Sequence, residues 1–291
     1  MKHKRFTILL PLLTMLIAAC SPLSTPTVTL PTSTPGPTAT PLVFPPTATP
    51  TPNETAPKRI EFNSTDGTKL VGYYHPAIVK NAPVVVLMHW AQGTQQDWGE
   101  PWQGVGLIKW LQNSDGSKVK SFNGTYPPLP TGVSFAVFTF DFRGFGESQG
   151  TEDPQGWLQD AQAAMLIARS LPGVNPESLS VIGASIGADA AADACAEGCL
   201  GALSLSPGNN LGVPYKDAVT LLNNAQKNAW CVAGEYDSLS SEACESASGN
   251  LYKKIIYSSQ DHGMMLFFRK GLKPAIEQTL LDFLTQVYGL K

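Results

Sequence analysis

Histidine and cysteine are scarce in this sequence. Only 4 of the 291 residues are histidine and 5 are cysteine. Structural and catalytic zinc sites gather several such residues at short, regular spacings. None of the histidines stands at ligand spacing near the cysteines. We therefore expect no bound metal, and nothing in the sequence calls for an organic cofactor.

Basic charge is in short supply as well. The 20 Lys and Arg residues are outnumbered by 23 Asp and Glu residues, which gives a formal net charge of −3. Three of the basic residues, Lys2, Lys4 and Arg5, lie in a predicted leader, and their removal would take the net charge to −6. Nucleic-acid-binding domains are typically basic, with lysine and arginine clustered on one face. The sequence therefore predicts no nucleic-acid partner.

The N-terminal apolar run is too short to span a bilayer as a helix of the mature protein. It covers Phe6 to Ala19 and follows a basic start, a combination that predicts a signal peptide over residues 1–19. Its end, Leu16-Ile-Ala-Ala-Cys20, resembles a bacterial lipobox, in which the cysteine is acylated and becomes the first mature residue. We expect an exported protein, anchored to the cell membrane through a lipidated Cys20 and facing the extracytoplasmic side. The alternative is ordinary cleavage near Ala19 with an unmodified Cys20.

Residues 20–57 form the second segment of the chain. After Cys20 they are almost entirely Pro, Thr, Ser, Ala and Leu. Proline removes backbone donors, and this composition cannot bury a core, so we expect a disordered tether. An extended proline-rich chain rises about 3.1 Å per residue, so the segment could reach on the order of 100 Å. The alternative is a tail without a spacing role.

From residue 58 to residue 291 the pattern predicts one globular domain, expected to be a monomer. Residues 58–74 have the alternation of two strands around the turn Asp66-Gly67. Later apolar runs predict strands at 83–90, 135–141, 178–184, 200–206, 229–234 and 253–257. Helical spacing occurs at 97–111, 154–171, 186 onward, 215–227, 240–248 and 274–288, and 112–132 has the composition of an inserted loop. A hairpin followed by alternating strands and helices predicts an α/β fold with a mostly parallel sheet and helices on both faces.

Four cysteines remain besides Cys20. An even number in an exported chain permits two disulfides, and the sequence alone allows three pairings. We expect one bond between Cys195 and Cys199, across a short loop, and one between Cys231 and Cys244. Buried free thiols are the alternative.

The stretch that organises the chain is Gly183-Ala-Ser-Ile-Gly187. It joins a short apolar strand to an alanine-rich helix and has the G-x-S-x-G pattern of a nucleophile elbow. Such a turn is so tight that its central residue takes strained backbone angles, which lifts the hydroxyl of Ser185 out at the end of the sheet. The helix that begins there directs unpaired N–H groups toward an anion forming beside the serine. The pentapeptide by itself fits equally well a tight turn in an unrelated parallel-sheet protein.

Polar or small residues also follow other predicted strands. His89 and Ala91 follow one strand, Asp237 another, and His262 the last. Ligands of open α/β sheets bind beyond the carboxyl ends of the strands. We therefore expect these residues to meet Ser185 at one edge of the sheet.

On these residues the chain resembles the α/β-hydrolase family over 58–291, in particular small members akin to dienelactone hydrolases and serine esterases. The family's order of nucleophile, acid and base implies Ser185, Asp237 and His262 as a catalytic triad. Its histidine takes the serine proton, and its carboxylate holds the imidazole in the right tautomer. Glu235 is the alternative acid, whereas Asp261 is discounted because it is adjacent to the histidine in an extended loop.

The resemblance also implies an oxyanion hole. Such a site needs two backbone N–H donors. The resemblance implies that one is the N–H of Ile186, the residue after the nucleophile, and that the other is the N–H of Ala91, in the loop after strand 83–90. Trp90 is the alternative second donor, because many relatives have glycine where this chain has tryptophan. Its ring either walls the acyl pocket or packs in the core. The loop 141–148 matches the family's D-x-R-G-x-G-x-S pattern and implies a structural role, with Arg143 as a buried ion-pair partner.

Only about a dozen residues separate Pro207 from the next predicted helix, where the family usually inserts a lid. We therefore expect a small cap and an open site, with 112–132 able to supply one wall. Together these features predict an exported serine esterase that cleaves small-molecule carboxylic esters through an acyl-enzyme. The alternatives are a peptidase or amidase of the same fold and a cell-envelope module that kept the fold without the reaction.

Overall fold

The computed structural model describes residues 56–99, 104–114, 116 and 118–291. The predicted signal peptide, Cys20 and nearly all of the predicted linker lie outside these residues. Every described residue belongs to one compact unit, Thr38–Lys291. This unit carries its own sheet and its own two hydrophobic cores, which is what a separately folding domain requires.

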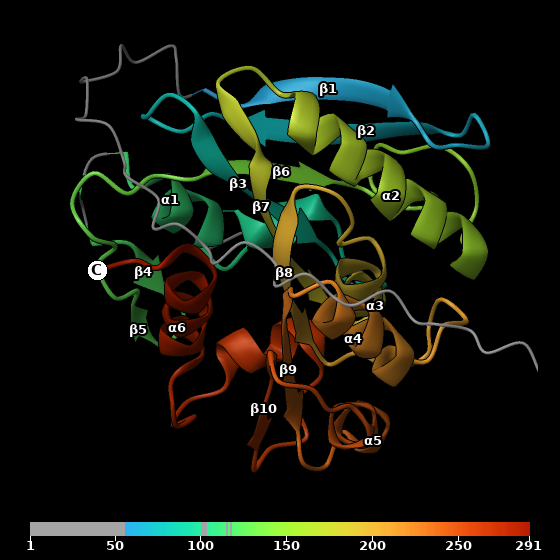
Figure 1. Ribbon diagram of the computed structural model, residues 1–291, viewed down its shortest axis with the longest axis vertical. Helices are drawn as coiled ribbons and strands as arrows, with labels where there is room; N and C mark the ends of the chain where they lie inside the picture. The colour runs from blue at the N-terminus through green and yellow to red at the C-terminus, as the bar shows by residue number, and fades with distance from the viewer. Residues whose placement is uncertain (1–55, 100–103, 115, 117) are drawn as a thin grey trace, which may run out of the picture. The chain divides into compact units, whose positions relative to one another are not determined.

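The main sheet has eight strands in the order β1-β2-β6-β3-β7-β8-β9-β10 (Figure 1). The predicted N-terminal hairpin is the antiparallel pair β1 and β2, and β2 also pairs antiparallel with β6, whereas the remaining pairs are parallel. The strands are β1 (Lys58–Asn63), β2 (Lys69–His75), β3 (Ala82–Met88), β6 (Ala136–Phe140), β7 (Val174–Ala184), β8 (Cys199–Leu205), β9 (Asn228–Gly234) and β10 (Tyr252–Tyr257). The expected mostly parallel α/β sheet is therefore confirmed.

The central strands are buried on both faces. Every residue of β3 and of β6 is buried, whereas β1 at the sheet edge buries only Phe62. Strands covered on both sides consist of continuous runs of apolar residues rather than alternating ones. This is why the sequence 82–88 is apolar throughout.

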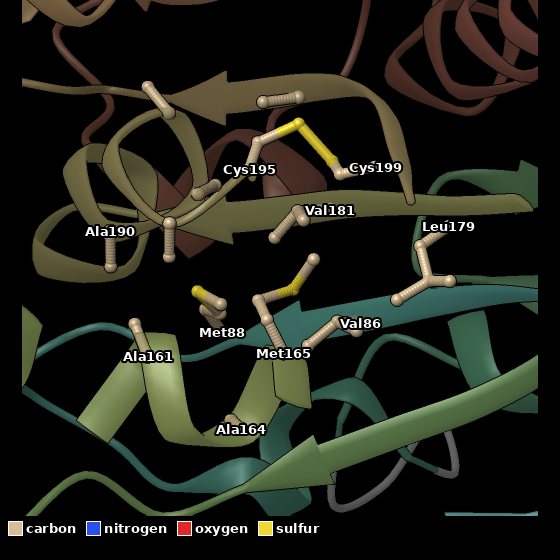
Figure 2. Close-up of a cluster of buried hydrophobic side chains, with 14 of the residues drawn as sticks. Val86, Met88, Ala161, Ala164, Met165, Leu179, Val181, Ala190, Cys195 and Cys199 are labelled. Carbon is tan, nitrogen blue, oxygen red and sulfur yellow. A yellow bond between two sulfur atoms is a disulfide. The ribbon is translucent and has the colours of Figure 1, made fainter. Parts of the chain in front are cut away.

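Helices cover the two faces and create two cores. The helices α2 (Pro154–Ser170), α3 (Ile186–Asp193), α4 (Tyr215–Asn224) and α5 (Ser238–Ser246) contribute to one core, and α1 (Leu107–Gln112) and α6 (Ile276–Tyr288) to the other. In Figure 1 the first group lies to the right of the sheet and the second to the left. Figure 2 shows part of the first core, in which small residues such as Ala161 and Ala190 let the helices approach the strands closely.

The predicted helix over 97–111 is wrong. The structure has a short 3-10 helix, η1 (Gln95–Trp98), and α1 begins only at Leu107. Gly106 has a φ of 76°, and a Cβ at Gly104 would overlap the carbonyl oxygen of Asp97. These glycines permit a turn that a continuous helix excludes. The predicted loop 112–132 also contains a small two-stranded hairpin, β4 (Lys120–Ser121) and β5 (Gly124–Thr125).

Both expected disulfides are present. Cys195 is bonded to Cys199, visible in Figure 2, and Cys231 is bonded to Cys244, with Cα–Cα distances of 5.2 and 5.6 Å. The first closes the turn between α3 and β8, and the second ties β9 to α5. Among the described helices none is long and apolar enough to cross a membrane.

Candidate active site

The turn between β7 and α3 is strained at Ser185. This residue has φ 53° and ψ −116°, a positive φ that is uncommon for a residue with a side chain. A Cβ added at Gly183 would overlap the carbonyl oxygen of Gly187, and one added at Gly187 would overlap the carbonyl oxygen of Met88. The two glycines of the pentapeptide are therefore required by close backbone approach on both sides of the serine.

Ser185, His262 and Asp237 form one hydrogen-bonded row. The Nε2 of His262 lies 2.8 Å from the Oγ of Ser185, and its Nδ1 lies 2.8 Å from an Oδ of Asp237. Asp237 directly precedes α5 and His262 directly precedes η2 (Gly263–Phe268), so each side chain comes from a loop after a strand of the parallel sheet. The His262 side chain is 38% exposed and that of Asp237 only 13%, so the row opens to solvent at its histidine. The sequence expectation that these three residues meet at one edge of the sheet is met.

Two serines that the sequence analysis missed support the carboxylate. Burial acts to raise the pKa of Asp237, but hydrogen bonds with His262, Ser240 and Ser206 outweigh it, and the pKa is lowered. Ser240 lies 3.5 Å from Nδ1 of His262, and the Oγ of Ser206 accepts the backbone N–H of Gly263 at 2.8 Å. Ser206 is fully buried at the end of β8, the same sheet edge as the other site residues. The position of Ser206 at the end of a predicted strand was the one feature of the sequence that could have identified it as a site residue.

The structure distinguishes among the three candidate acids. Glu235 is exposed, and the carboxylate within hydrogen-bonding distance of the imidazole is that of Asp237. Asp261 is engaged elsewhere, because it accepts hydrogen bonds from Arg269 and Ser259.

The loop after β3 is held by a buried histidine. His89 is fully buried, and its Nδ1 donates to the carbonyl oxygen of Trp90 at 2.7 Å while its Nε2 accepts the N–H of Phe142 at 3.0 Å. The Trp90 oxygen also accepts the N–H of Gly93 at 3.3 Å. In a planar trans peptide the carbonyl and the next N–H point in opposite directions. The two hydrogen bonds to the Trp90 oxygen therefore also fix the direction of the Ala91 N–H, which points away from His89.

The ring of Trp90 is fixed beside the elbow. Its Nε1 donates to Asp97 at 2.7 Å, and burial raises the pKa of that carboxyl group. A Cβ added at Gly263 would lie 3.6 Å from Cε3 of Trp90 and 3.7 Å from the backbone nitrogen of Ser185. The indole and the backbone of Ser185 therefore both lie close to Gly263.

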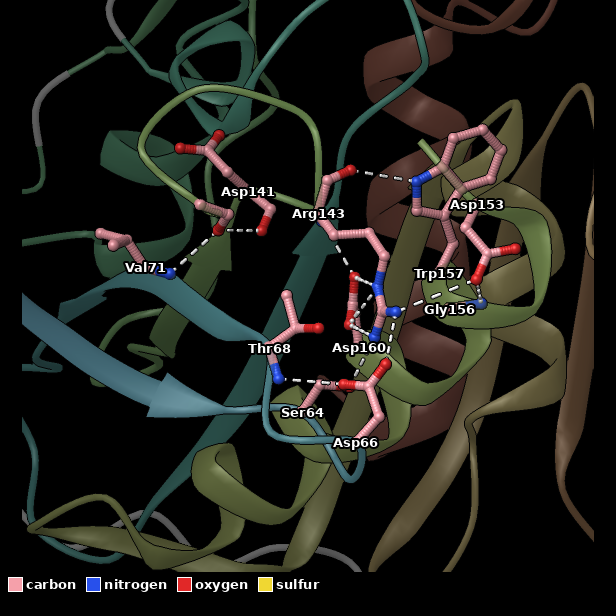
Figure 3. Close-up of polar contacts among 11 residues, drawn as sticks. Ser64, Asp66, Thr68, Val71, Asp141, Arg143, Asp153, Gly156, Trp157 and Asp160 are labelled. Atoms are coloured by element: carbon pink, nitrogen blue, oxygen red, sulfur yellow. Dashed lines mark hydrogen bonds and ion pairs between the residues drawn. The ribbon is translucent and has the colours of Figure 1, made fainter. Parts of the chain in front are cut away.

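Arg143 is a structural residue, as expected. Its side chain is 7% exposed and is paired with Asp160 at 2.7 Å and with Asp66 at 2.6 Å (Figure 3). The hydrogen bond from Arg143 lowers the pKa of Asp66 well below its usual range. The neighbouring Asp141 accepts the N–H groups of Gln95 and Glu147 at 2.9 and 3.0 Å. This network joins the 141–148 loop to the hairpin β1–β2, to α2 and to η1.

The segment between β8 and α4 is a short, pinned loop. Buried Asp189 accepts the N–H groups of Gly208 and Asn210 at 2.8 and 3.0 Å. Beside this loop lies an open cavity of about 700 Å³, whose lining includes Asp237, Leu239 and His262. The loop between β8 and α4 is therefore a small cap, as expected from the sequence.

Comparison with known proteins identifies the fold. No protein-family model matches the chain. The esterase Pf2001 of Pyrococcus furiosus superposes with a TM-score of 0.56 at 16% identity, over 84% of this chain and 99% of that one. A putative alpha/beta hydrolase from Agrobacterium tumefaciens gives 0.53 at 20% identity, over 80% and 97% of the two chains. The acetyl xylan esterase of Paenibacillus sp. R4 gives 0.53 at 16% identity, over 83% and 87%.

The described domain thus has the α/β-hydrolase fold. Among curated sequences, the uncharacterized protein YfhR of Escherichia coli K12 is 33% identical over 129 residues, and its counterpart in Salmonella typhi is 32% identical over 130 residues. Each match covers 44% of this chain and 37% or 36% of the relative, so the chain spans little more than a third of the length of the curated relatives it matches.

Proposed function

We propose that this protein is a serine hydrolase that cleaves carboxylic esters through an acyl-enzyme on Ser185. The observation that carries the proposal is the row of Ser185, His262 and Asp237, with 2.8 Å separating each pair of hydrogen-bonded atoms, at a serine held in a strained turn. The fold is similar to those of known hydrolases and esterases, which supports hydrolysis as the class of reaction.

In the first half of the reaction, His262 accepts the proton of Ser185 at Nε2 as Oγ attacks the ester carbonyl carbon. The carbonyl oxygen becomes negatively charged, and the N–H groups of Ile186 and Ala91 are the proposed donors to it. His262 then gives its proton to the leaving alcohol, which departs and leaves the acyl group on Ser185.

In the second half, water attacks the acyl carbon while Nε2 of His262 takes a proton from that water. The proton then returns to Oγ of Ser185 as the carboxylic acid leaves. Through both steps the Asp237 carboxylate accepts the hydrogen bond from Nδ1–H of His262 and stabilises the imidazolium. Its lowered pKa supports this role, since the carboxylate must stay ionised while the imidazole changes charge.

Labelling with a fluorophosphonate tests the nucleophile directly. Such probes react with serines activated by a base and an oxyanion hole. Residues 38–291, the unit that carries both cores, would be labelled and analysed by mass spectrometry. We expect an adduct on Ser185 that is absent in Ser185→Ala and retained in Ser258→Ala, a control at an exposed serine. A folded protein without an adduct would instead favour a non-catalytic envelope module.

An ester panel tests the bond that is cleaved. Ser185→Ala should abolish hydrolysis of short acyl esters while the melting temperature stays close to that of the wild type. Acetylated xylan belongs in the panel because one structural neighbour is an acetyl xylan esterase. Labelled protein that cleaves matched amides faster than esters would replace the esterase assignment with a peptidase or amidase.

We further propose that the enzyme is exported and anchored to the membrane through Cys20, outside the described residues. The lipobox-like sequence supports this, and two disulfides are consistent with an oxidising compartment. In cells, Cys20→Ser should move the protein from the membrane fraction to the soluble fraction. An unchanged membrane fraction would contradict anchoring by this cysteine.

A further inference from the structure

Two phenylalanines form an exposed aromatic pair on this domain. The rings of Phe122 and Phe268 meet edge to face with centroids 4.2 Å apart, yet they are 46% and 38% exposed. Met265 is 42% exposed in the same 3-10 helix as Phe268. Large apolar side chains that stand in water without a partner mark sites of interaction when they gather in one place.

The pair joins two segments far apart in the sequence. Phe122 lies at the turn between β4 and β5, and Phe268 ends η2. Asn123 fixes the contact, since its Nδ2 donates to the carbonyl oxygens of Phe267 and Arg269, both at 2.8 Å. The surface is therefore built into the fold and does not depend on two side chains meeting by chance.

Only positive charge flanks the aromatic pair in these two segments. Neither 118–131 nor 263–275 contains an aspartate or glutamate. Four lysines on them are exposed, namely Lys118, Lys120, Lys270 and Lys273. Arg269 is also present but is paired with Asp261. In a chain whose acidic residues outnumber its basic ones, this is a local reversal of charge.

We propose that this aromatic–basic surface, formed by Phe122, Met265, Phe268 and the four lysines, docks onto an anionic lipid bilayer. Aromatic side chains partition to the headgroup region of a membrane. Each lysine near an anionic surface strengthens binding by about fivefold, and several together with apolar side chains give reversible attachment. Charge complementarity favours anionic lipid, and the exposed rings favour a partner with an apolar interior over a soluble polyanion.

Docking would bring the site close to the bilayer, because η2 begins immediately after His262. None of these seven residues belongs to the Ser185 row, and Cys20 lies outside the described residues, so the proposal does not depend on catalysis or on lipidation.

Sedimentation with vesicles tests the proposal. The protein used would be residues 38–291, which lack both the predicted leader and Cys20. It would be mixed with neutral vesicles of phosphatidylcholine alone, or with strongly anionic vesicles that contain roughly 40% phosphatidylglycerol. We expect binding to the anionic vesicles only, weakened by salt. Lys120→Gln/Lys270→Gln should weaken it about 25-fold, and Phe122→Ser about tenfold.

Matched controls lie on other elements of the fold, α4 and β2. Leu221→Ser removes an apolar side chain that is 68% exposed on α4, and Lys69→Gln/Lys216→Gln removes two exposed charges elsewhere. Neither control should change vesicle binding. The proposal is overturned if the wild type does not sediment with anionic vesicles, if the controls weaken binding as much as the surface variants, or if Phe122→Ser has no effect. The lysine variant and Phe122→Ser would also be tested for binding to heparin, a soluble polyanion. If both variants weaken heparin binding equally, the proposal is overturned in favour of a soluble polyanion.

Discussion

The imidazole of His89 donates from Nδ1 to the carbonyl oxygen of Trp90 at 2.7 Å, inside a fully buried environment. Burial lowers the pKa of His89 to about 4, so the ring is neutral at physiological pH. Its second nitrogen accepts the N–H of Phe142 at 3.0 Å, which fixes the tautomer. His89 thereby connects the 141–148 loop to the loop that carries Ala91.

His89→Leu should lower kcat on esters by about 10- to 100-fold with little change in KM, because the Ala91 N–H loses its fixed direction and one oxyanion donor is worth about 100- to 1,000-fold. His89→Asn, which keeps a donor near the Nδ1 position, should recover part of the loss. The measurement is steady-state kinetics on a short acyl ester at saturating and limiting substrate. A parallel loss of folding and activity in both variants, with no recovery in Asn, would reduce His89 to a packing residue.

Gly183→Ala should cost about 3 kcal/mol or more of the free energy of unfolding, because the new methyl group would overlap the Gly187 carbonyl oxygen and neither backbone can move. Gly124→Ala is the matched control, since the space around that glycine is open. Urea denaturation compares the two. Similar stabilities for both variants would mean that the elbow tolerates a Cβ and that the glycine is not sterically required.

The acid side of the pH–rate profile should report a single proton. His262 must be neutral to accept the proton of Ser185, whereas Asp237, whose pKa is lowered, stays ionised as the pH falls. A plot of log kcat/KM against pH should therefore have a limiting slope of one. Removal of the supporting hydrogen bonds by Ser206→Ala/Ser240→Ala should raise the pKa of Asp237 but leave the slope at one, because the hydrogen bond with His262 lowers that pKa more than either serine does. A slope of two in the wild type would contradict the ionised state of Asp237.

Asp193 should make the domain less stable as the pH rises. Burial, with the nearby charge of Asp189, raises the pKa of Asp193 to about 7, and this residue ends α3, where the helix dipole also disfavours a negative charge. The folded state holds more protons than the unfolded state between pH 4 and pH 7, so this group lowers the free energy of unfolding as the pH rises through that range.

Asp193→Asn should therefore raise the free energy of unfolding above pH 7 by on the order of 1–3 kcal/mol, with little effect at pH 4. Asp217→Asn, at an exposed carboxylate on α4, is the control and should change it little. Chemical denaturation at pH 4 and pH 8 checks both. An equal gain at the two pH values would rule out a titrating cause.

Local patterns in the sequence were enough for most of the elements and for several candidate residues of the site. Apolar runs identified the central strands because parallel strands are buried on both faces. The pentapeptide at Ser185 identified the tight turn because only glycine fits at Gly183 and Gly187. The sequence allowed three disulfide pairings, and the structure has the one that we expected. The prediction of a helix over 97–111 was wrong because the spacing of apolar residues does not show where the backbone turns, here at Gly104 and Gly106.

The contacts that give the candidate site its chemistry join residues far apart in the chain, and only the tertiary structure decided them. Asp237 rather than Glu235 meets His262 because the turn after β9 directs one carboxylate inward and leaves the other exposed. Ser206, Ser240 and His89 act through hydrogen bonds whose partners come from other strands and loops. The sequence by itself determined which residue types stand at the ends of the strands. Their distances, partners and protonation depend on how eight strands pack side by side, which no local pattern encodes.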